Sequence, residues 1–274
     1  MQIQKLTAEI HGEQIHYFRA GAGPSLLLLH GLLGGAFCWR RNMEAFSRRH
    51  TVFAVDLPGH GENDASREMD CSMTAQANRV LSLLNHLQLE EVDVVGCSWG
   101  GAIAMLLAAQ SAKVRSLVLA APVNPWSTLG LGRIRFLNGR TGEALLRMIW
   151  PFSRPLYPTA LDRMYGDPKR LPAGTVAGYI AQIMRPGRVN NILNTLRSWE
   201  KDVDSLRAAI SKIKARSLLI WGTRDSAVDV RSAEPLRQAL PQCQLKIIEG
   251  AGHLPFEETP DQFNRLVLDF IDQR

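Results

Sequence analysis

The stretch Val94-Val95-Gly96-Cys97-Ser98-Trp99-Gly100-Gly101 decides the predicted fold of this 274-residue chain. It places the pattern Gly-x-Ser-x-Gly between a short apolar strand, residues 92–95, and an almost entirely apolar helix, residues 102–109. A serine between a strand and a helix sits in a sharp, strained turn, and glycines on either side leave room for it. The dipole and the free N–H groups at the start of the helix would act on its hydroxyl. The pattern therefore predicts a turn that presents Ser98 for chemistry, the alternative being a serine that only caps the helix.

Short apolar runs alternate with helical patterns along most of the chain. Helical spacing is plainest over residues 74–87 and in the last helix, which begins at Pro260. Strands that are apolar throughout and alternate with helices indicate a mainly parallel sheet covered on both faces. We therefore expect an α/β protein with an eight-stranded, mainly parallel sheet. Its strands should be an N-terminal hairpin, residues 3–10 and 15–18, followed by residues 25–29, 51–55, 92–95, 114–119, 217–221 and 244–248.

One segment, residues 122–200, lacks strand-like runs and differs in charge from the rest of the chain. It carries eleven Lys and Arg residues against four acids, a net charge of +7, whereas the remainder carries −1. Helical patches over residues 142–150, 176–184 and 189–199 indicate a lid inserted between strands of the sheet. We expect residues 1–121 and 201–274 to form the core domain, and residues 122–200 to form an inserted helical cap.

Three further motifs follow predicted strands. His30-Gly31-Leu32-Leu33-Gly34-Gly35 follows an early strand, Asp225 lies in Trp221-Gly222-Thr223-Arg224-Asp225, and His253 ends Gly250-Ala251-Gly252-His253. Ligands and catalysis gather beyond the carboxyl ends of parallel strands, so these motifs and Ser98 should meet at one edge of the sheet. A serine hydroxyl needs a base to act as a nucleophile, and a histidine held by a buried carboxylate supplies one.

With these motifs the chain resembles the α/β-hydrolase family over nearly its whole length. The matching residues are His30-Gly31, Asp56-Leu57-Pro58-Gly59-His60-Gly61, Gly96 to Gly100, Trp221 to Asp225, and Gly252-His253. The resemblance implies Ser98 as the nucleophile, His253 as the general base and Asp225 as the acid that orients the histidine. It also implies an oxyanion hole formed by the backbone N–H groups of Leu32 and Trp99.

Other residues compete for these roles. Asp229 could replace Asp225 as the acid, but Asp225 has the spacing that the family uses. Asn124 follows a strand after which some family members place their acid, and an asparagine cannot do that work. We expect His30 to support the oxyanion loop and His60 to be structural. Cys97 should be a buried thiol that points away from Ser98.

The resemblance and the intact Ser98/His253/Asp225 set predict a serine-dependent hydrolase that cleaves an ester or thioester through an acyl-enzyme. Three alternatives stay open: a carbon–carbon bond hydrolase, a cofactor-free perhydrolase or haloperoxidase, and a non-catalytic small-molecule receptor. An aspartate in place of Ser98 would mark the dehalogenase and epoxide-hydrolase branches of the family, so the serine argues against both. Leu254-Pro255-Phe256 follows His253 where carbon–carbon bond hydrolases often have a tryptophan, which weakens that alternative.

Composition restricts cofactors and partners. Neither Gly21-Ala22-Gly23 nor the glycines between Gly31 and Gly35 have dinucleotide or P-loop spacing, and the four cysteines have no metal-site spacing. We therefore expect no cofactor and no metal. The basic cap would attract an acyl substrate on an acidic carrier, coenzyme A or an acyl carrier protein, through Arg133, Arg135, Arg140, Arg185 or Arg188. We expect no nucleic-acid or membrane partner and a cytoplasmic location, and the oligomeric state stays open.

Overall fold

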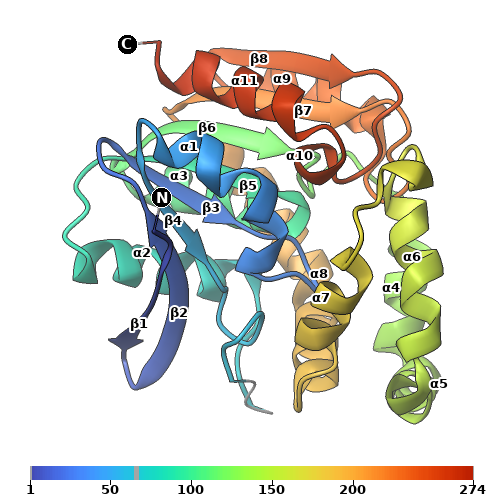
Figure 1. Cartoon of the computed structure of the whole chain (residues 1–274). Helices are drawn as coiled ribbons and strands as arrows, with labels where there is room; N and C mark the ends of the chain where they lie inside the picture. Colours follow the sequence, from blue (N-terminus) through green and yellow to red (C-terminus); the bar gives the residue numbers. More distant parts are fainter. Residues whose placement is uncertain (1, 65–67, 274) are drawn as a thin grey trace.

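The computed structural model of the chain describes residues 2–64 and 68–273, and its strands form an eight-stranded sheet (Figure 1). The strand order is β1-β2-β4-β3-β5-β6-β7-β8. β2 runs antiparallel to both of its neighbours, and all other neighbouring pairs are parallel. The prediction of a mainly parallel eight-stranded sheet is confirmed. The strands are β1 Gln4–Ile10, β2 Glu13–Ala20, β3 Ser25–Leu29, β4 Thr51–Val55, β5 Val92–Cys97, β6 Val114–Ala120, β7 Arg216–Gly222 and β8 Cys243–Ile248.

The central strands are apolar throughout because both faces of the sheet are covered. In β3, Leu27 and Leu29 pack into the core on one face, and Leu26 and Leu28 pack into the core on the other. All four leucines are 0% exposed. Successive side chains of a strand point to opposite faces, so a strand buried on both sides needs an unbroken apolar run.

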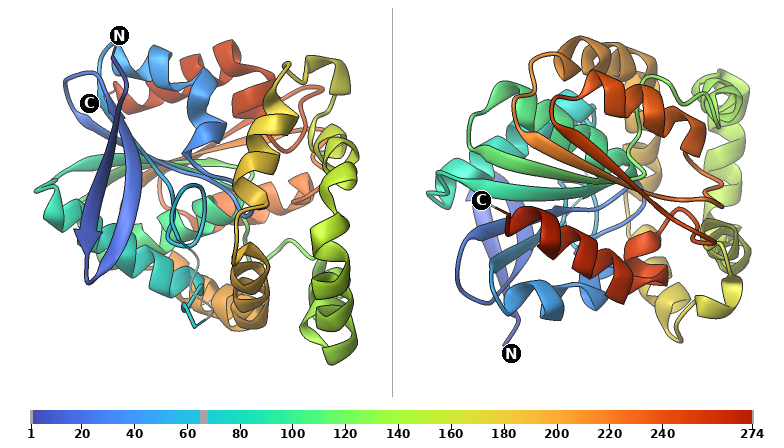
Figure 2. Two further views of the ribbon diagram at one scale, coloured as in Figure 1. Left: turned by 60° about the horizontal axis from the view of Figure 1, so that its bottom comes forward. Right: turned by 90° about the horizontal axis from the view of Figure 1, so that it is seen from above.

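Two layers of helices cover the sheet (Figure 2). Side chains of α2, α3, α8 and α9 pack into the core on one face, and those of η1, α1, α10 and α11 pack into the core on the other. α3 is buried from Trp99 to Ala108, which explains why the sequence of this helix has no polar side. These elements are α1 Met43–Ser47, α2 Met73–His86, α3 Ser98–Gln110, α8 Arg188–Ile210, α9 Ala233–Ala239, α10 Pro255–Glu258, α11 Pro260–Ile271, and the 3-10 helices η1 Ala36–Arg41 and η5 Val230–Ser232.

Between β6 and β7 the chain leaves the sheet and forms further helices beyond the carboxyl ends of the strands (Figure 1). The expected boundary at residue 200 falls inside α8, which continues without a break to Ile210. The second half of α8 packs against the core through Leu206 and Ile210. We keep the word cap for residues 122–200. Its remaining elements are α4 Leu131–Asn138, α5 Arg140–Ile149, α6 Tyr157–Met164, α7 Thr175–Ile183, and the 3-10 helices η2 Trp150–Phe152, η3 Arg154–Leu156 and η4 Pro168–Arg170.

Candidate active site

Ser98 occupies the turn between β5 and α3 with a left-handed backbone, φ +50°. Side chains other than glycine rarely adopt this conformation, which costs on the order of 1–3 kcal/mol. The flanking positions must be glycine because there is no space for a side chain there. A Cβ at Gly100 would lie 2.3 Å from the carbonyl oxygen of His30, and one at Gly96 would lie 2.6 Å from the carbonyl oxygen of Gly100. The turn predicted from Gly-x-Ser-x-Gly is therefore present, and Ser98 lines a cavity below the cap.

His253 and Asp225 form a buried pair after β8 and β7. The Nδ1 atom of His253 lies 2.9 Å from Oδ2 of Asp225, and the two side chains are 7% and 0% exposed. The other carboxylate oxygen, Oδ1, accepts backbone hydrogen bonds from Ala227 at 2.8 Å and Val228 at 2.9 Å. When Nδ1–H donates to the carboxylate, a neutral imidazole keeps its free lone pair on Nε2. His253 lines the same cavity as Ser98.

The loop after β3 passes directly against Ser98. A Cβ at Gly31 would lie 3.2 Å from the Cβ of Ser98. Leu32, the next residue, and Trp99, in the first turn of α3, both line the cavity. The first N–H groups of a helix have no partner within the helix, which leaves the N–H of Trp99 suited to an anionic oxygen. The structure thus brings both expected oxyanion donors to the cavity that Ser98 lines.

Two buried histidines support this loop. His30 is fully buried, with Nε2 accepting the N–H of Leu57 at 2.9 Å and Nδ1 facing the carbonyl oxygen of Gly31 at 2.8 Å. Burial lowers the pKa of His30 to about 4 and the pKa of His60 to about 3. The His60 ring packs between those of His30 and Trp99, with centroid separations of 5.6 and 5.0 Å. Both rings therefore stay neutral at pH 7, which suits a supporting role.

The competing candidates lie elsewhere. Asp229 pairs with Arg231 at 2.6 Å and does not contact His253. The buried Asn124 side chain donates to Ser232 and accepts the N–H of Trp126, so it fixes a turn. Cys97 is buried, as expected, but it lines the cavity together with Ser98. Its side chain packs with Cys38 of η1 in the core on one face of the sheet.

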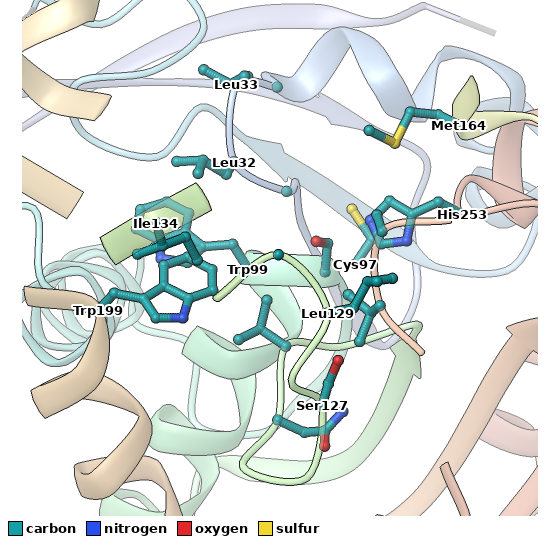
Figure 3. Close-up of a pocket in the computed structure, with 18 of the residues that line it drawn as sticks. Leu32, Leu33, Cys97, Trp99, Ser127, Leu129, Ile134, Met164, Trp199 and His253 are labelled. Carbon is teal, nitrogen blue, oxygen red and sulfur yellow. The ribbon is translucent and has the colours of Figure 1, made fainter. Parts of the chain in front are cut away.

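The cavity has a volume of about 850 Å³ and lies between the sheet edge and the cap. Figure 3 shows His253 and Cys97 at one part of it and the apolar side chains of Ile134 and Trp199 at another. Its wall is mainly apolar, and three arginines, Arg133, Arg135 and Arg207, also border it. A cavity of this size and character accepts an acyl chain or another mainly apolar molecule. Among the residues that the structure describes, no group of three or more His, Cys, Asp or Glu side chains could hold a metal ion.

Sequence reasoning missed two polar clusters that join the cap to the core. In the first, the buried Arg188 guanidinium donates to the carbonyl oxygens of Gly59 and Gly61, and burial lowers the Arg188 pKa to about 10. Arg188 was expected to meet an acidic carrier at the surface. That expectation is wrong, since Arg188 is only 4% exposed. A lone arginine at the start of a helix carries no sequence signal of burial.

The second cluster surrounds Glu257, whose side chain is 0% exposed. The hydroxyl groups of two cap residues, Tyr165 and Tyr179, donate to its carboxylate, and Arg40 pairs with it at 2.8 Å. Burial raises the pKa of Glu257 in spite of the arginine. Because Tyr179 also lines the cavity, this cluster fixes the cavity wall to the core.

A strained serine after β5 and a histidine after β8 line one cavity, and an acid after β7 contacts the histidine, an arrangement typical of α/β hydrolases. A family model described as the alpha/beta hydrolase fold matches residues 24–260. The chain belongs to this family.

The chain is similar to an uncharacterised protein and to several proteins that are named as hydrolases or lipases. An uncharacterised protein of Mycobacterium tuberculosis is 31% identical, with 96% of this chain and 80% of that protein aligned. The human monoacylglycerol lipase ABHD6 is 27% identical, with 92% of this chain and 77% of that protein aligned. A 2-hydroxy-6-oxononadienedioate/2-hydroxy-6-oxononatrienedioate hydrolase of Pseudomonas putida is 28% identical, with 94% of this chain and 91% of that protein aligned. The structure of an epoxide hydrolase, 23% identical, shares the fold over 99% of both chains with a TM-score of 0.85.

Proposed function

We propose that the protein is a serine hydrolase that cleaves an ester or thioester of a mainly apolar acyl group through an acyl-enzyme. The observation that carries the proposal is the buried His253–Asp225 pair, because His253 lines the same cavity as the strained Ser98. The lipase among the relatives supports an ester substrate.

In the proposed reaction, Ser98 Oγ attacks the carbonyl carbon while His253 Nε2 takes its proton. The carbonyl oxygen becomes an oxyanion, which the N–H groups of Leu32 and Trp99 stabilise. The C–O or C–S bond then breaks, and His253 returns the proton to the leaving group. Water, deprotonated by the same imidazole, hydrolyses the acyl-enzyme and restores Ser98. Asp225 stabilises the imidazolium formed in both halves of the reaction.

The substrate could also carry negative charge. Arg133 and Arg135 border the cavity from α4, so they would meet the phosphates of coenzyme A or the acidic surface of an acyl carrier protein. Such attraction acts on association and weakens as salt is added. We expect kcat/KM for an acyl-CoA to fall steeply from low to high ionic strength and that for a neutral ester to stay flat. Parallel responses would remove the carrier from the proposal.

A carbon–carbon bond hydrolase is the second candidate, favoured by the Pseudomonas putida relative and by the arginines at the cavity, which could pair with a dicarboxylate product. A perhydrolase or haloperoxidase activity would use the same three residues with peroxide as the acyl acceptor. A non-catalytic receptor would bind a ligand in the cavity without turnover.

The deciding experiment compares p-nitrophenyl esters of increasing chain length, acyl-CoA thioesters and a vinylogous 1,5-diketone acid in parallel. It adds a bromination assay with peroxide and acetate, and a fluorophosphonate label located by peptide mass spectrometry. We expect the highest kcat/KM on an ester or thioester, with the label on Ser98. Preferred cleavage of the diketone acid would transfer the proposal to the carbon–carbon class. Tight ligand binding without turnover or labelling would refute a hydrolase.

A further inference from the structure

The cap exposes large apolar side chains to solvent. Of the ten exposed large apolar side chains in the described part of the chain, eight lie between residues 126 and 156. The most exposed are Phe152 at 79%, Met148 at 64% and Leu156 at 62%. A cluster of this kind on one segment marks an interaction surface, since scattered single residues would be the norm.

Five of these side chains follow one another along the helical run from α5 through η2 and η3, which leads into α6. The backbone keeps the right-handed helical conformation at Trp150, Ser153 and Tyr157, where one element passes into the next. Within the α-helix α5, side chains three or four positions apart lie on the same side, which places Leu145, Met148 and Ile149 together. Phe152 and Leu156 follow in η2 and η3. These five residues, hereafter the apolar stripe, are Leu145, Met148, Ile149, Phe152 and Leu156.

Positive charge accompanies the apolar stripe. Arg140, Arg154 and Arg163, on the same helical run, are exposed and form no ion pair with any residue that the structure describes. In contrast, the cap acids Glu143 and Glu200 already pair with arginines. Arg140, Arg154 and Arg163 are therefore available to a negatively charged partner.

The same helical run also reaches the candidate active site. α6, which continues the run, lines the cavity through Tyr157, Leu161 and Met164. α4, α5 and α6 stand together at the outer end of the molecule, away from the helices that cover the sheet (Figures 1 and 2). A partner held on the apolar stripe would lie next to the helices that form the cavity wall.

We propose that the apolar stripe docks the cap on the surface of an anionic lipid bilayer. Apolar side chains that project from a basic helix insert at the boundary between headgroups and acyl chains, where each nearby arginine gains further attraction. A second copy of the chain is a poor occupant, because it would bring two caps of +7 into contact. An acidic protein would need a pocket for each projecting side chain, whereas a bilayer accepts them without one.

This docking is peripheral. No helix among the described residues is long and apolar enough to cross a membrane. The proposal replaces the expectation that the chain has no membrane partner. It goes beyond the proposed function, because binding to vesicles needs no acyl transfer.

The test measures sedimentation of the Ser98→Ala protein with vesicles, since this variant cannot hydrolyse the lipids. Vesicles of phosphatidylcholine alone are compared with vesicles containing 30 mol% phosphatidylglycerol. We expect at least tenfold stronger partitioning to the anionic vesicles at low salt. The double change Phe152→Ser/Leu156→Ser should reduce it at least tenfold. The matched control, Ile3→Ser/Ile247→Ser, removes two exposed apolar side chains of the core and should change it less than twofold.

A second pair of variants tests the charge. Arg140→Gln/Arg154→Gln should weaken binding to anionic vesicles about fivefold for each arginine, whereas Arg48→Gln/Arg265→Gln, on the core, should not. Equal partitioning to both kinds of vesicle, or binding that survives Phe152→Ser/Leu156→Ser, would overturn the proposal. A third result would also overturn it: the protein forms a dimer in analytical ultracentrifugation, Phe152→Ser/Leu156→Ser dissociates this dimer, and the protein does not bind vesicles. Turnover of a soluble ester is measured separately with Phe152→Ser/Leu156→Ser in the protein that keeps Ser98. Failure of the hydrolase proposal can thus be distinguished from failure of the docking proposal.

Discussion

The Nδ1 atom of His253 lies 2.9 Å from the Oδ2 atom of Asp225, and the second oxygen of that carboxylate is held by the N–H groups of Ala227 and Val228. The carboxylate is thus fixed by its own turn before it orients the imidazole. Asp229, four residues further on, instead pairs with the exposed Arg231. Two aspartates close in sequence therefore have different surroundings, and this difference gives a matched pair of variants.

Asp225→Asn should lower kcat by about 10⁴-fold, because an amide neither stabilises the imidazolium nor keeps the ring in the required tautomer. Asp229→Asn should change kcat less than threefold. Steady-state kinetics on a p-nitrophenyl ester measure both. A larger loss at Asp229 would contradict the assignment of the acid.

The unfolding free energy should depend on pH through His30 and His60. In the folded protein their pKa values are about 4 and about 3, whereas the unfolded chain titrates near the ordinary 6.5. Below pH 6.5 the unfolded state takes up protons that the folded state refuses, so each histidine lowers stability by about 1.4 kcal/mol per pH unit as pH falls towards 4.

His60→Asn should remove one of these contributions. Above pH 6.5 the variant should be less stable than the wild type, and the gap should narrow as the pH falls. Urea unfolding at pH 7, 6 and 5 measures the gap. Parallel curves for the two proteins would show that His60 does not contribute.

Arg188→Met should lower the unfolding free energy by about 2–4 kcal/mol, because it leaves the carbonyl oxygens of Gly59 and Gly61 without their charged donor. Arg185→Met is the control, since the Arg185 side chain makes no hydrogen bond or ion pair with a described residue, and it should cost less than about 0.5 kcal/mol. Urea unfolding compares the two. Equal effects would contradict the view that Arg188 holds the cap to the loop after β4.

Ile134→Trp should shorten the acyl chain that the protein accepts. Ile134 lines the cavity, so a larger side chain there removes space. We expect kcat/KM to fall at least tenfold for a p-nitrophenyl octanoate and less than twofold for the acetate. The control is Phe136→Trp on the same helix, whose side chain is 53% exposed and does not line the cavity. Equal losses on both esters would mean that this part of the cavity does not hold the acyl chain.

Local pattern was enough to predict the sheet and the Ser98 turn. The central strands are short apolar runs between turn residues, and α3 follows β5 at once, so neighbouring residues alone carry the signal. The predicted strands over residues 25–29 and 51–55 coincide with β3 and β4. Between these two strands the structure has a 3-10 helix, η1, and a short α-helix, α1, which meet at Asn42.

The surroundings of individual side chains were decided only by the tertiary structure. In the sequence, Arg188 and Arg140 belong to one basic group. In the structure, Arg188 is buried by its contact with the Gly59–Gly61 loop, whereas Arg140 is exposed to solvent. Likewise, the periodicity of α5 predicts a helix with an apolar side, and that side faces away from the core. Helical spacing is the same whether an apolar side is packed or exposed, since it depends on residues a few positions apart. What covers that side depends on residues far away in the sequence, and these meet only in the folded chain.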